Sequence, residues 1–289
     1  MTLAVLARVN LIFLLIGLSL AAQAQPRFLP QPNYGQLKPP DQAEGRRVLE
    51  EFRAKGIAGD YYLQIELHVL PRRGDEHVLT GRIWGTRTVQ GPLSRIEIVT
   101  DPVTKTELRL LVQNGPEPAC SSKVGDNEVR TLGPEALMQP IAGTNLTAFD
   151  LQMSFLYWPD FAYEGLVRMR GRPTHQFLLY PPKEFAEKYP ALSNVRVYLD
   201  TQFNALVQTE LLGSRGEVIK TISLMELKRV QDQWIPRSID IRDEATRDKT
   251  RLVVTGAALG LTLPREIFDK DQLAKEAAKP PAERIVPIE

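Results

Sequence analysis

Histidine, cysteine and paired carboxylates are the residue types that could perform chemistry in this chain of 289 residues, and they are few. None of the three histidines, His68, His77 and His175, has a second histidine or a cysteine at the spacing of a metal site. Each fits a surface or core position better than a ligand role, so no metal or other cofactor is expected. Cys120 lies in the stretch PACSS, which favours a passive thiol over a redox or intermolecular role.

The carboxylates offer acid–base chemistry only if two of them meet in space. The aspartates fall where helix caps and turns are expected, and there a short carboxylate binds backbone amides. They are Asp41, Asp60, Asp101, Asp150, Asp160 and Asp200. The motifs Gly-x-Ser-x-Gly and His-Glu-x-x-His and the phosphate-binding glycine loop are absent from the sequence. We therefore expect a protein that is not an enzyme, with a hydrolase of lipids or glycans as the catalytic alternative.

Composition and charge exclude other classes of protein. The formal net charge is +1, and removal of an export signal containing Arg8 and no acid would leave about zero. Nucleic acid is not an expected partner, because a nucleic-acid-binding protein needs a basic surface. One cysteine cannot form an internal disulfide, so stability must come from burial and hydrogen bonds.

The first residues have the pattern of a secretory signal peptide. Arg8 precedes an apolar run at residues 11–20, and the small-residue sequence Ala22-Gln23-Ala24 follows it. The run is shorter than the roughly 20 residues that a membrane-spanning helix needs. We predict a signal peptide over residues 1–24, cleaved between Ala24 and Gln25, and hence an exported, soluble protein.

The folded part is expected to begin after a proline-rich linker at residues 25–40. Asp41 can cap a helix over residues 42–55, whose apolar residues recur at one-turn spacing. Residues 61–69 alternate strictly between apolar and polar side chains, which is typical of a half-buried strand. Further strands are predicted at residues 78–88, 93–100, 106–113, 161–169, 174–180, 195–199, 205–212, 218–230, 234–242 and 250–255.

The remaining segments suggest how the sheet is covered. Residues 117–132 are polar and irregular, and helical patterns follow at residues 134–140 and 148–156, the second of which could act as a lid. Large apolar side chains gather there: Leu151, Met153, Phe155, Leu156, Tyr157, Trp158 and Phe161. Either they fill the core, or they cover the mouth of a cavity that a curled sheet encloses and that suits an apolar ligand. About ten antiparallel strands with few helices must curl or close, because a long flat edge invites aggregation.

An ordered series of segments carries a family resemblance. The segments are AFDLQMSFLYWPDFAYEG, GRPTHQFLLYPP, VRVYLDTQFNALVQTELLGSRGEVIKTISLMELKRVQDQWIPRSIDIRD, KTRLVV and LPREIF. In this order they resemble the outer-membrane lipoprotein-sorting protein family, the relatives of the periplasmic carrier LolA. The first half of the chain fits more loosely, through LTGRIW at residues 79–84 and GPLSRIE at residues 91–97.

The resemblance implies a mainly β fold, a half-open antiparallel β-barrel covered by helices, over residues 41–268, followed by a charged tail at residues 269–289. It implies a periplasmic carrier that shields acyl chains of lipoproteins or phospholipid during outer-membrane lipoprotein sorting. An inner-membrane releasing transporter and an outer-membrane acceptor would be its partners. The alternative is a non-enzymatic envelope sensor or interaction protein on the same fold. The candidates for the lipid pocket are Leu63, Ile65, Leu67, Ile83, Ile96, Ile98, Leu108, Leu110, Leu151, Phe155, Val197 and Leu199.

Overall fold

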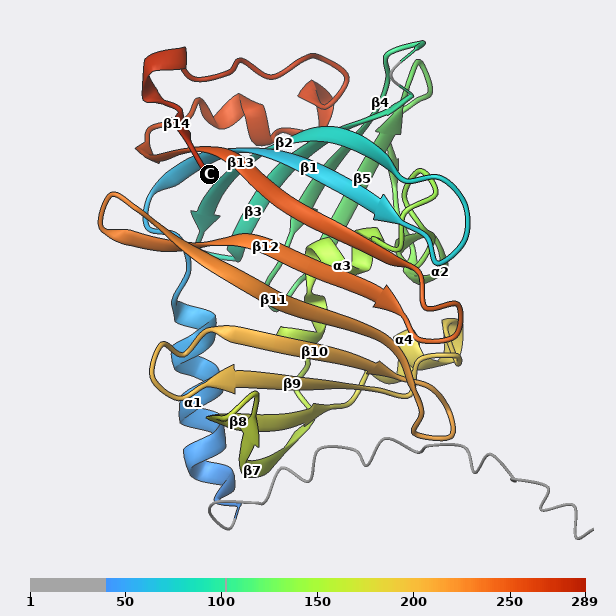
Figure 1. Ribbon diagram of the computed structural model, residues 1–289, viewed down its shortest axis with the longest axis vertical. Coiled ribbons are helices and arrows are strands. Elements are labelled where there is room, and N and C mark those ends of the chain that lie inside the picture. Colours follow the sequence, from blue (N-terminus) through green and yellow to red (C-terminus); the bar gives the residue numbers. More distant parts are fainter. Residues whose placement is uncertain (1–39, 102) are drawn as a thin grey trace, which may run out of the picture. The chain divides into compact units, whose positions relative to one another are not determined.

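One antiparallel sheet dominates the computed structural model, which describes residues 40–101 and 103–289 (Figure 1). All of these residues lie in one unit that spans residues 34–289. The predicted signal peptide over residues 1–24 and, except for Pro40, the predicted linker over residues 25–40 lie outside the described residues. Among the helices that the structure describes, none has the length and apolar character needed to cross a membrane.

The sheet is long and does not close on itself. Its strands are β1 (Asp60–Leu70), β2 (His77–Thr88), β3 (Gly91–Asp101), β4 (Thr106–Gln113), β5 (Ala119–Val124), β6 (Arg130–Thr131), β7 (Phe161–Met169), β8 (Arg172–Leu179), β9 (Asn194–Asp200), β10 (Leu206–Leu212), β11 (Val218–Val230), β12 (Gln233–Asp243), β13 (Lys249–Leu261) and β14 (Val286–Pro287). Their order across the sheet is β6, β5, β4, β3, β2, β1, β13, β12, β11, β10, β9, β8 and β7, and β14 pairs with β13. Within the described part of the chain β6 and β7 are free edges, and the predicted half-open antiparallel barrel is confirmed.

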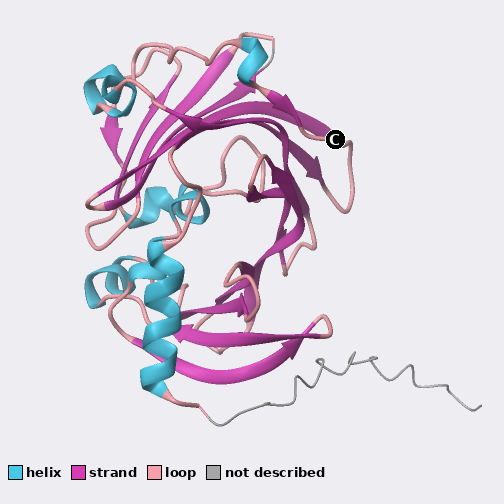
Figure 2. Cartoon of the chain, turned by 90° about the vertical axis from the view of Figure 1, so that its left-hand side faces the viewer, coloured by secondary structure: helices cyan, strands magenta, loops and turns pink. Residues whose placement is uncertain are grey.

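Short helices line the open side of the curved sheet (Figure 2). They are α1 (Gln42–Ala54), α2 (Pro134–Leu137), α3 (Ala148–Gln152) and α4 (Lys183–Lys188), with the 3₁₀ turns η1 (Ser154–Tyr157), η2 (Arg265–Phe268), η3 (Lys270–Gln272) and η4 (Ala282–Arg284) elsewhere in the chain. The Asp41 carboxylate caps α1 by accepting a hydrogen bond from the backbone N–H of Ala43 at 3.0 Å. Gly45 packs so closely on β7 that an added Cβ would lie 2.4 Å from the Cβ of Tyr163. The glycine therefore lets α1 cover this end of the sheet.

The strand predictions coincide with eleven strands, and β4, β7 and β11 have the predicted bounds. The predicted number of about ten misses β5, β6 and β14. In β5, Ser122 lies on the buried side opposite Leu110, so a polar residue interrupts the apolar alternation. β13 continues beyond residue 255 to Leu261 through Gly256, Ala257 and Ala258, which are small residues with little preference for strands.

Residues 262–289, which we call the strap, cover the outer face of β1 to β4 and β13 (Figure 1). Tyr62, Trp84 and Ala258 of the sheet pack there in an apolar cluster. The strap contributes Leu263, Ile267, Phe268 and Ala277 to the same cluster. The Trp84 indole also donates a hydrogen bond to the carbonyl oxygen of Ala278 at 3.0 Å. The strands in this half of the sheet are therefore covered on both faces.

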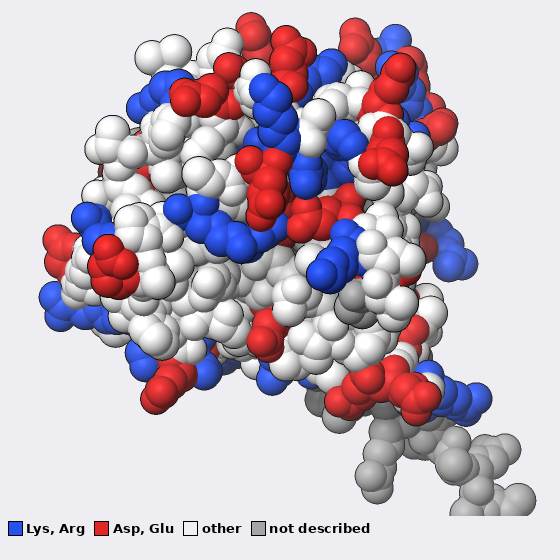
Figure 3. Space-filling view, turned by 90° about the horizontal axis from the view of Figure 1, so that it is seen from above, with Lys and Arg blue, Asp and Glu red and all other residues white. Residues whose placement is uncertain are grey.

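A buried ion pair lies between the strap and the sheet. The side chains of Arg95 and Glu97 on β3 are each 1% exposed, and Arg95 Nη2 lies 2.8 Å from Glu97 Oε1. Burial lowers the pKa of Arg95, and the charge of Glu97 opposes that shift. The Arg95 guanidinium also donates to three strap carbonyls, those of Ile267, Gln272 and Lys275. One arginine thus ties the strap to the sheet. The face of the molecule that lies at the top of Figure 1 carries acidic and basic side chains mixed together (Figure 3).

Arg95→Met should destabilise the protein strongly. It leaves Glu97 buried with only Arg82, at 2.9 Å, as its ion-pair partner, and it frees the three strap carbonyls. We expect the free energy of unfolding, measured in urea, to fall by about 3 kcal/mol. The matched control is Arg47→Met, because Arg47 is exposed and pairs with Glu51 on the surface of α1; its effect should stay within about 0.5 kcal/mol. Equal effects of the two substitutions would contradict the role of Arg95.

Candidate functional site

The twelve predicted pocket residues come together on the inner face of the half-barrel. The strand register places Leu63 opposite Ile83 and Ile96 opposite Leu110, and residues directly opposite each other share a face. All twelve belong to one apolar cluster, in which nine are buried: Leu63, Ile65, Leu67, Ile96, Ile98, Leu110, Phe155, Val197 and Leu199. The half-buried members are Ile83, Leu108 and Leu151. Their role in lipid binding stays a prediction.

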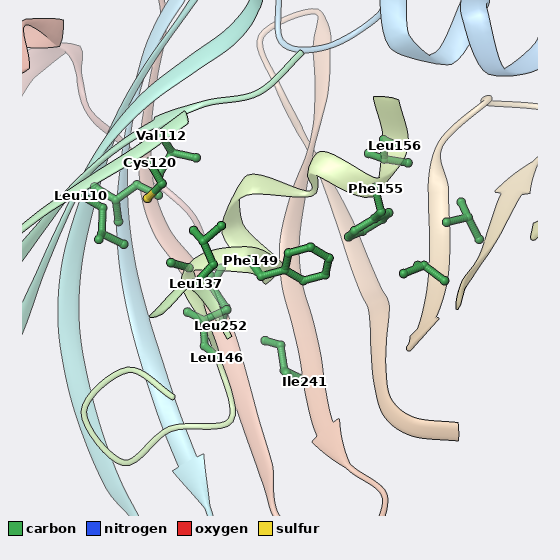
Figure 4. Close-up of a cluster of buried hydrophobic side chains, with 14 of the residues drawn as sticks. Leu110, Val112, Cys120, Leu137, Leu146, Phe149, Phe155, Leu156, Ile241 and Leu252 are labelled. Carbon is green, nitrogen blue, oxygen red and sulfur yellow. The ribbon is translucent and has the colours of Figure 1, made fainter. Parts of the chain in front are cut away.

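A layer formed by α2, α3, η1 and α4, which we call the helical layer, lies over this face. Figure 4 shows Phe149 of α3 among apolar side chains of the sheet and of the segments around α2. The ring centroid of Phe149 lies 5.6 Å from that of Phe155 and 5.4 Å from that of Phe185. Trp158 completes the group, with its centroid 5.7 Å from that of Phe185. Aromatic rings of the protein therefore occupy the concave side of the sheet.

The helical layer is broken where the sequence predicts one helix. Residues 148–156 form α3 and η1 instead, because Met153 adopts a left-handed backbone conformation with φ of 50°. A capping box begins α3: Asp150 N–H donates to Thr147 Oγ1, and Thr147 N–H donates to Asp150 Oδ2. The prediction of a single helix is wrong at Met153, and the break turns Phe155 toward the inner cluster.

Few polar contacts fasten the helical layer to its surroundings. Lys220 Nζ on β11 lies 2.8 Å from Asp150 Oδ2, and the Asp150 side chain is 1% exposed. The other oxygen, Asp150 Oδ1, has no hydrogen-bond partner among the described residues. On the other side, Arg53 of α1 donates to the carbonyl oxygens of Leu156 at 2.6 Å and Trp158 at 3.3 Å. Gln152 of α3 also donates to the carbonyl oxygen of Gln113 on β4 at 3.2 Å. Apolar packing completes the attachment of the layer.

The residues capable of chemistry are dispersed. Cys120 is buried beside the inner cluster, and burial raises its pKa to about 12, so the thiol stays protonated near neutral pH. His175 Nδ1 lies 2.8 Å from the hydroxyl of Tyr163, and His68 Nε2 lies 2.8 Å from Glu66 Oε2. Within residues 40–101 and 103–289, no group of three or more histidine, cysteine or acidic residues could hold a metal ion. The inner face therefore offers apolar burial as its chemistry.

A polar hollow lies elsewhere, at the end of β3, β4 and β5. Its volume is about 230 Å³, and its lining is Thr104, Lys105, Thr106, Glu107, Arg109, Lys123, Gly125 and Asp126. Charged side chains of both signs make this hollow unsuitable for an acyl chain.

Sequence reasoning missed several residues that complete the inner face. Phe149 lies in the segment AFDLQMSFLYWPDFAYEG but is not among the predicted pocket residues, because a helix of five residues gives no full apolar period. Phe185 lies on α4, a six-residue helix without a side-chain cap, so no start signal marked it. Lys220 follows the strand alternation as an inward residue, and its partner lies 70 residues away in the sequence.

Comparisons with known proteins identify the family. A family model described as "uncharacterized protein" matches residues 126–275, more than half of the chain. An outer-membrane lipoprotein-sorting protein domain from Vibrio parahaemolyticus has a similar structure, with a TM-score of 0.69 at 15% identity over 81% of this chain and 100% of that one. A LolA superfamily protein from Nitrosomonas europaea has a TM-score of 0.60 at 13% identity over 78% of this chain and 97% of that one. The chain belongs to the family of this model, and its fold is that of the LolA-like structures.

A further structure has the same LolA-like fold. It is a DUF1329 family protein from Desulfovibrio piger, with a TM-score of 0.68 at 12% identity over 82% of this chain and 100% of that one. At these identities the likeness concerns the fold. No curated protein matches the chain in sequence.

Lys220→Met should loosen the helical layer. The substitution keeps the apolar stem of Lys220 but leaves the buried Asp150 carboxylate without its cation. We expect the free energy of unfolding to fall by about 3 kcal/mol and hydrogen exchange to increase in α3 and η1. Adding Asp150→Asn should restore part of the loss, because a neutral amide oxygen can still cap α3. The control is Lys183→Met on α4, where the lysine is exposed and its ion pair spans 3.7 Å. If hydrogen exchange in α3 does not change in Lys220→Met, the ion pair between Lys220 and Asp150 does not hold the helical layer.

Cys120 should react slowly in the folded protein. With its pKa raised to about 12, roughly one thiol in 10⁴ is ionised at pH 8, and the side chain is also shielded. We expect iodoacetamide to alkylate Cys120 slowly in the folded protein at pH 8 and rapidly in urea. Mass spectrometry measures both reactions. An unfolded thiol ionises near pH 8.5, so the contribution of Cys120 to stability should be constant below about pH 8 and decrease as the pH rises toward 12. Rapid labelling without urea would contradict this environment.

Proposed function

We propose that this LolA-like chain is a periplasmic carrier that shields acyl chains of lipoproteins or phospholipid against the inner face of the half-barrel. The observation that carries the proposal is the continuous apolar cluster on that face, with the helical layer over it. An acyl chain has no hydrogen-bonding groups to satisfy, so apolar walls are sufficient for binding. The proposed role requires no catalytic residue.

The energetics favour a carrier that can also release its ligand. Burial of an acyl chain contributes roughly 0.8 kcal/mol per methylene, or about 12 kcal/mol for a chain of about sixteen carbons before ordering costs. The ligand must displace the rings of Phe149, Phe155 and Phe185 from the same face, which offsets part of that gain. Because ligand and protein side chains compete for one surface, binding stays reversible.

Location and partners follow from the same proposal. The predicted signal peptide over residues 1–24 supports export, and the likeness to the lipoprotein-sorting protein domain from Vibrio parahaemolyticus supports a role in outer-membrane lipoprotein sorting. Residues 41–268 would form the binding domain, and residues 269–289 would form most of its outer cover. An inner-membrane releasing transporter would supply the lipidated cargo, and an outer-membrane acceptor would receive it.

Leu108→Asp should weaken acyl-chain binding. Leu108 is half-buried on the inner face, where a carboxylate would oppose an apolar ligand. The matched control is Leu111→Asp on the same strand, because Leu111 is also half-buried but packs against the outer cluster under the strap. In titrations with a fluorescent long-chain fatty acid, we expect the affinity of Leu108→Asp to fall by about tenfold or more, while Leu111→Asp keeps the affinity of the unmodified protein.

The stabilities of both variants are measured in urea alongside the titrations. If Leu108→Asp and Leu111→Asp lose affinity equally, the inner face does not bind the ligand specifically and serves only as hydrophobic core. Absence of any uptake by the unmodified protein would overturn the proposed function.

A further inference from the structure

β12 and β13 are paired along only part of their lengths. Their ladder extends from the pair Ser238 and Val253 to the pair Arg242 and Lys249. Residues 233–236 of β12 pair with β11, but in the part of the chain that the structure describes residues 233–237 have no partner on β13. We call this gap in the ladder the seam. It is the place where the wall of the half-barrel lacks hydrogen bonds between two sequential neighbours.

The end of the strap lies in the seam. β14 pairs with the stretch of β13 that has lost β12, and the next residue, Ile288, donates its N–H to the carbonyl oxygen of Thr255 at 2.9 Å. On the opposite side, Lys228 Nζ of β11 donates to the backbone oxygen of Glu289 at 3.1 Å. Residues 286–289 therefore bridge β13 and the β11–β12 hairpin, and Figure 1 shows the end of the chain, marked C, between them.

One side chain of the strap reaches the inner cluster. Ile288 is 6% exposed and belongs to the cluster that contains Leu63 and Val254 of the inner face. Val286, two residues earlier, is 43% exposed. By contrast, Leu263, Ile267, Phe268 and Ala277 of the strap pack in the outer cluster. At the seam, therefore, an aliphatic side chain from the outer cover joins the interior of the half-barrel.

We propose that the seam is the port through which an acyl chain reaches the inner face, and that Ile288 is the plug that closes it. This inference rests on the proposed function and deepens it. Ile288 occupies the seam with an aliphatic group, so the path already accepts the chemistry of the ligand. An entering chain would replace apolar contacts of Ile288 with apolar contacts of its own methylenes.

The strap is fastened at its base and lightly held at its end. Arg95, Arg109 and Trp84 donate hydrogen bonds to backbone carbonyls of the strap between residues 267 and 278. Pro280 and Pro281 then separate this base from β14, a strand of only two residues. Residues 286–289 can therefore leave the seam while the base stays on the outer face, which is what a plug requires.

The test measures the rate of uptake of a fluorescent long-chain fatty acid by the full chain. Ile288→Gly removes the plug and should raise the rate by about tenfold or more, because opening no longer removes a buried aliphatic side chain. Val286→Ser, an exposed position on the same segment, is the matched control and should leave the rate unchanged.

A second variant closes the port with a covalent bond. Ala257 and Val286 are directly opposite in the β13–β14 pair, which suits a disulfide, so Ala257→Cys with Val286→Cys is made in a Cys120→Ala background. The oxidised form should take up the probe about tenfold more slowly, and reduction should restore the rate. If Ile288→Gly does not fold, the uptake rates of the oxidised and reduced disulfide variant show whether the seam is the port.

The outcomes separate the two proposals. Binding at equal rates by the unmodified protein, the oxidised and reduced disulfide variant and, if it folds, Ile288→Gly would overturn the port and leave the carrier function in place. Absence of binding by every form would overturn both.

Discussion

A curled antiparallel sheet that does not close leaves two faces and two edges, and the covering of its faces is the constraint on which this structure depends. In β1 and β2, neighbouring residues are apolar on opposite faces: Leu63 and Ile83 point inward, whereas Tyr62 and Trp84 point outward. Both faces of the sheet around β1 and β2 therefore need a cover, because a large exposed apolar surface is unfavourable in water. The helical layer supplies one cover and the strap supplies the other, so neither is an appendage to the sheet.

The two covers are attached by different kinds of interaction. Beneath the strap, the Arg95 guanidinium binds Glu97 and three backbone carbonyls in fixed directions, and such bonds are costly to break when they are buried. Over the inner face, rings such as Phe149 and Phe185 pack without directional bonds, and Asp150, Gln152 and Arg53 provide the few polar ties. Directional bonds thus hold the frame, and non-directional contacts lie where a ligand would have to be exchanged.

Strand alternation made the inner face predictable from the sequence. Leu63, Ile65 and Leu67 repeat with a period of two, which defines their common face whatever the rest of the chain does. The burial of Arg95 and Glu97 has no such local signal, because the strap that buries them lies some 170 residues further along the chain. The same applies to the Asp150 and Lys220 pair. The sequence therefore predicts which residues share a face and leaves open what covers it.

The small residues of β13 show how local sequence prepares the wall for the strap. An added Cβ on Gly256 would lie 2.5 Å from Gln64 Oε1 and 3.0 Å from Ile285 Cγ2, so the glycine leaves room for both side chains against this strand. The register between β1 and β13 also shifts here, between Gln64 and Ile65, which bends the strand where β12 has already separated from it. The bulge, Gly256 and the end of the β12–β13 ladder therefore lie together on β13. Glycine has a low strand propensity, but at this position it allows close contact with the strap. The irregularity of β13 is therefore a fitted feature of the half-barrel wall, and it explains why the predicted strand ended early at residue 255.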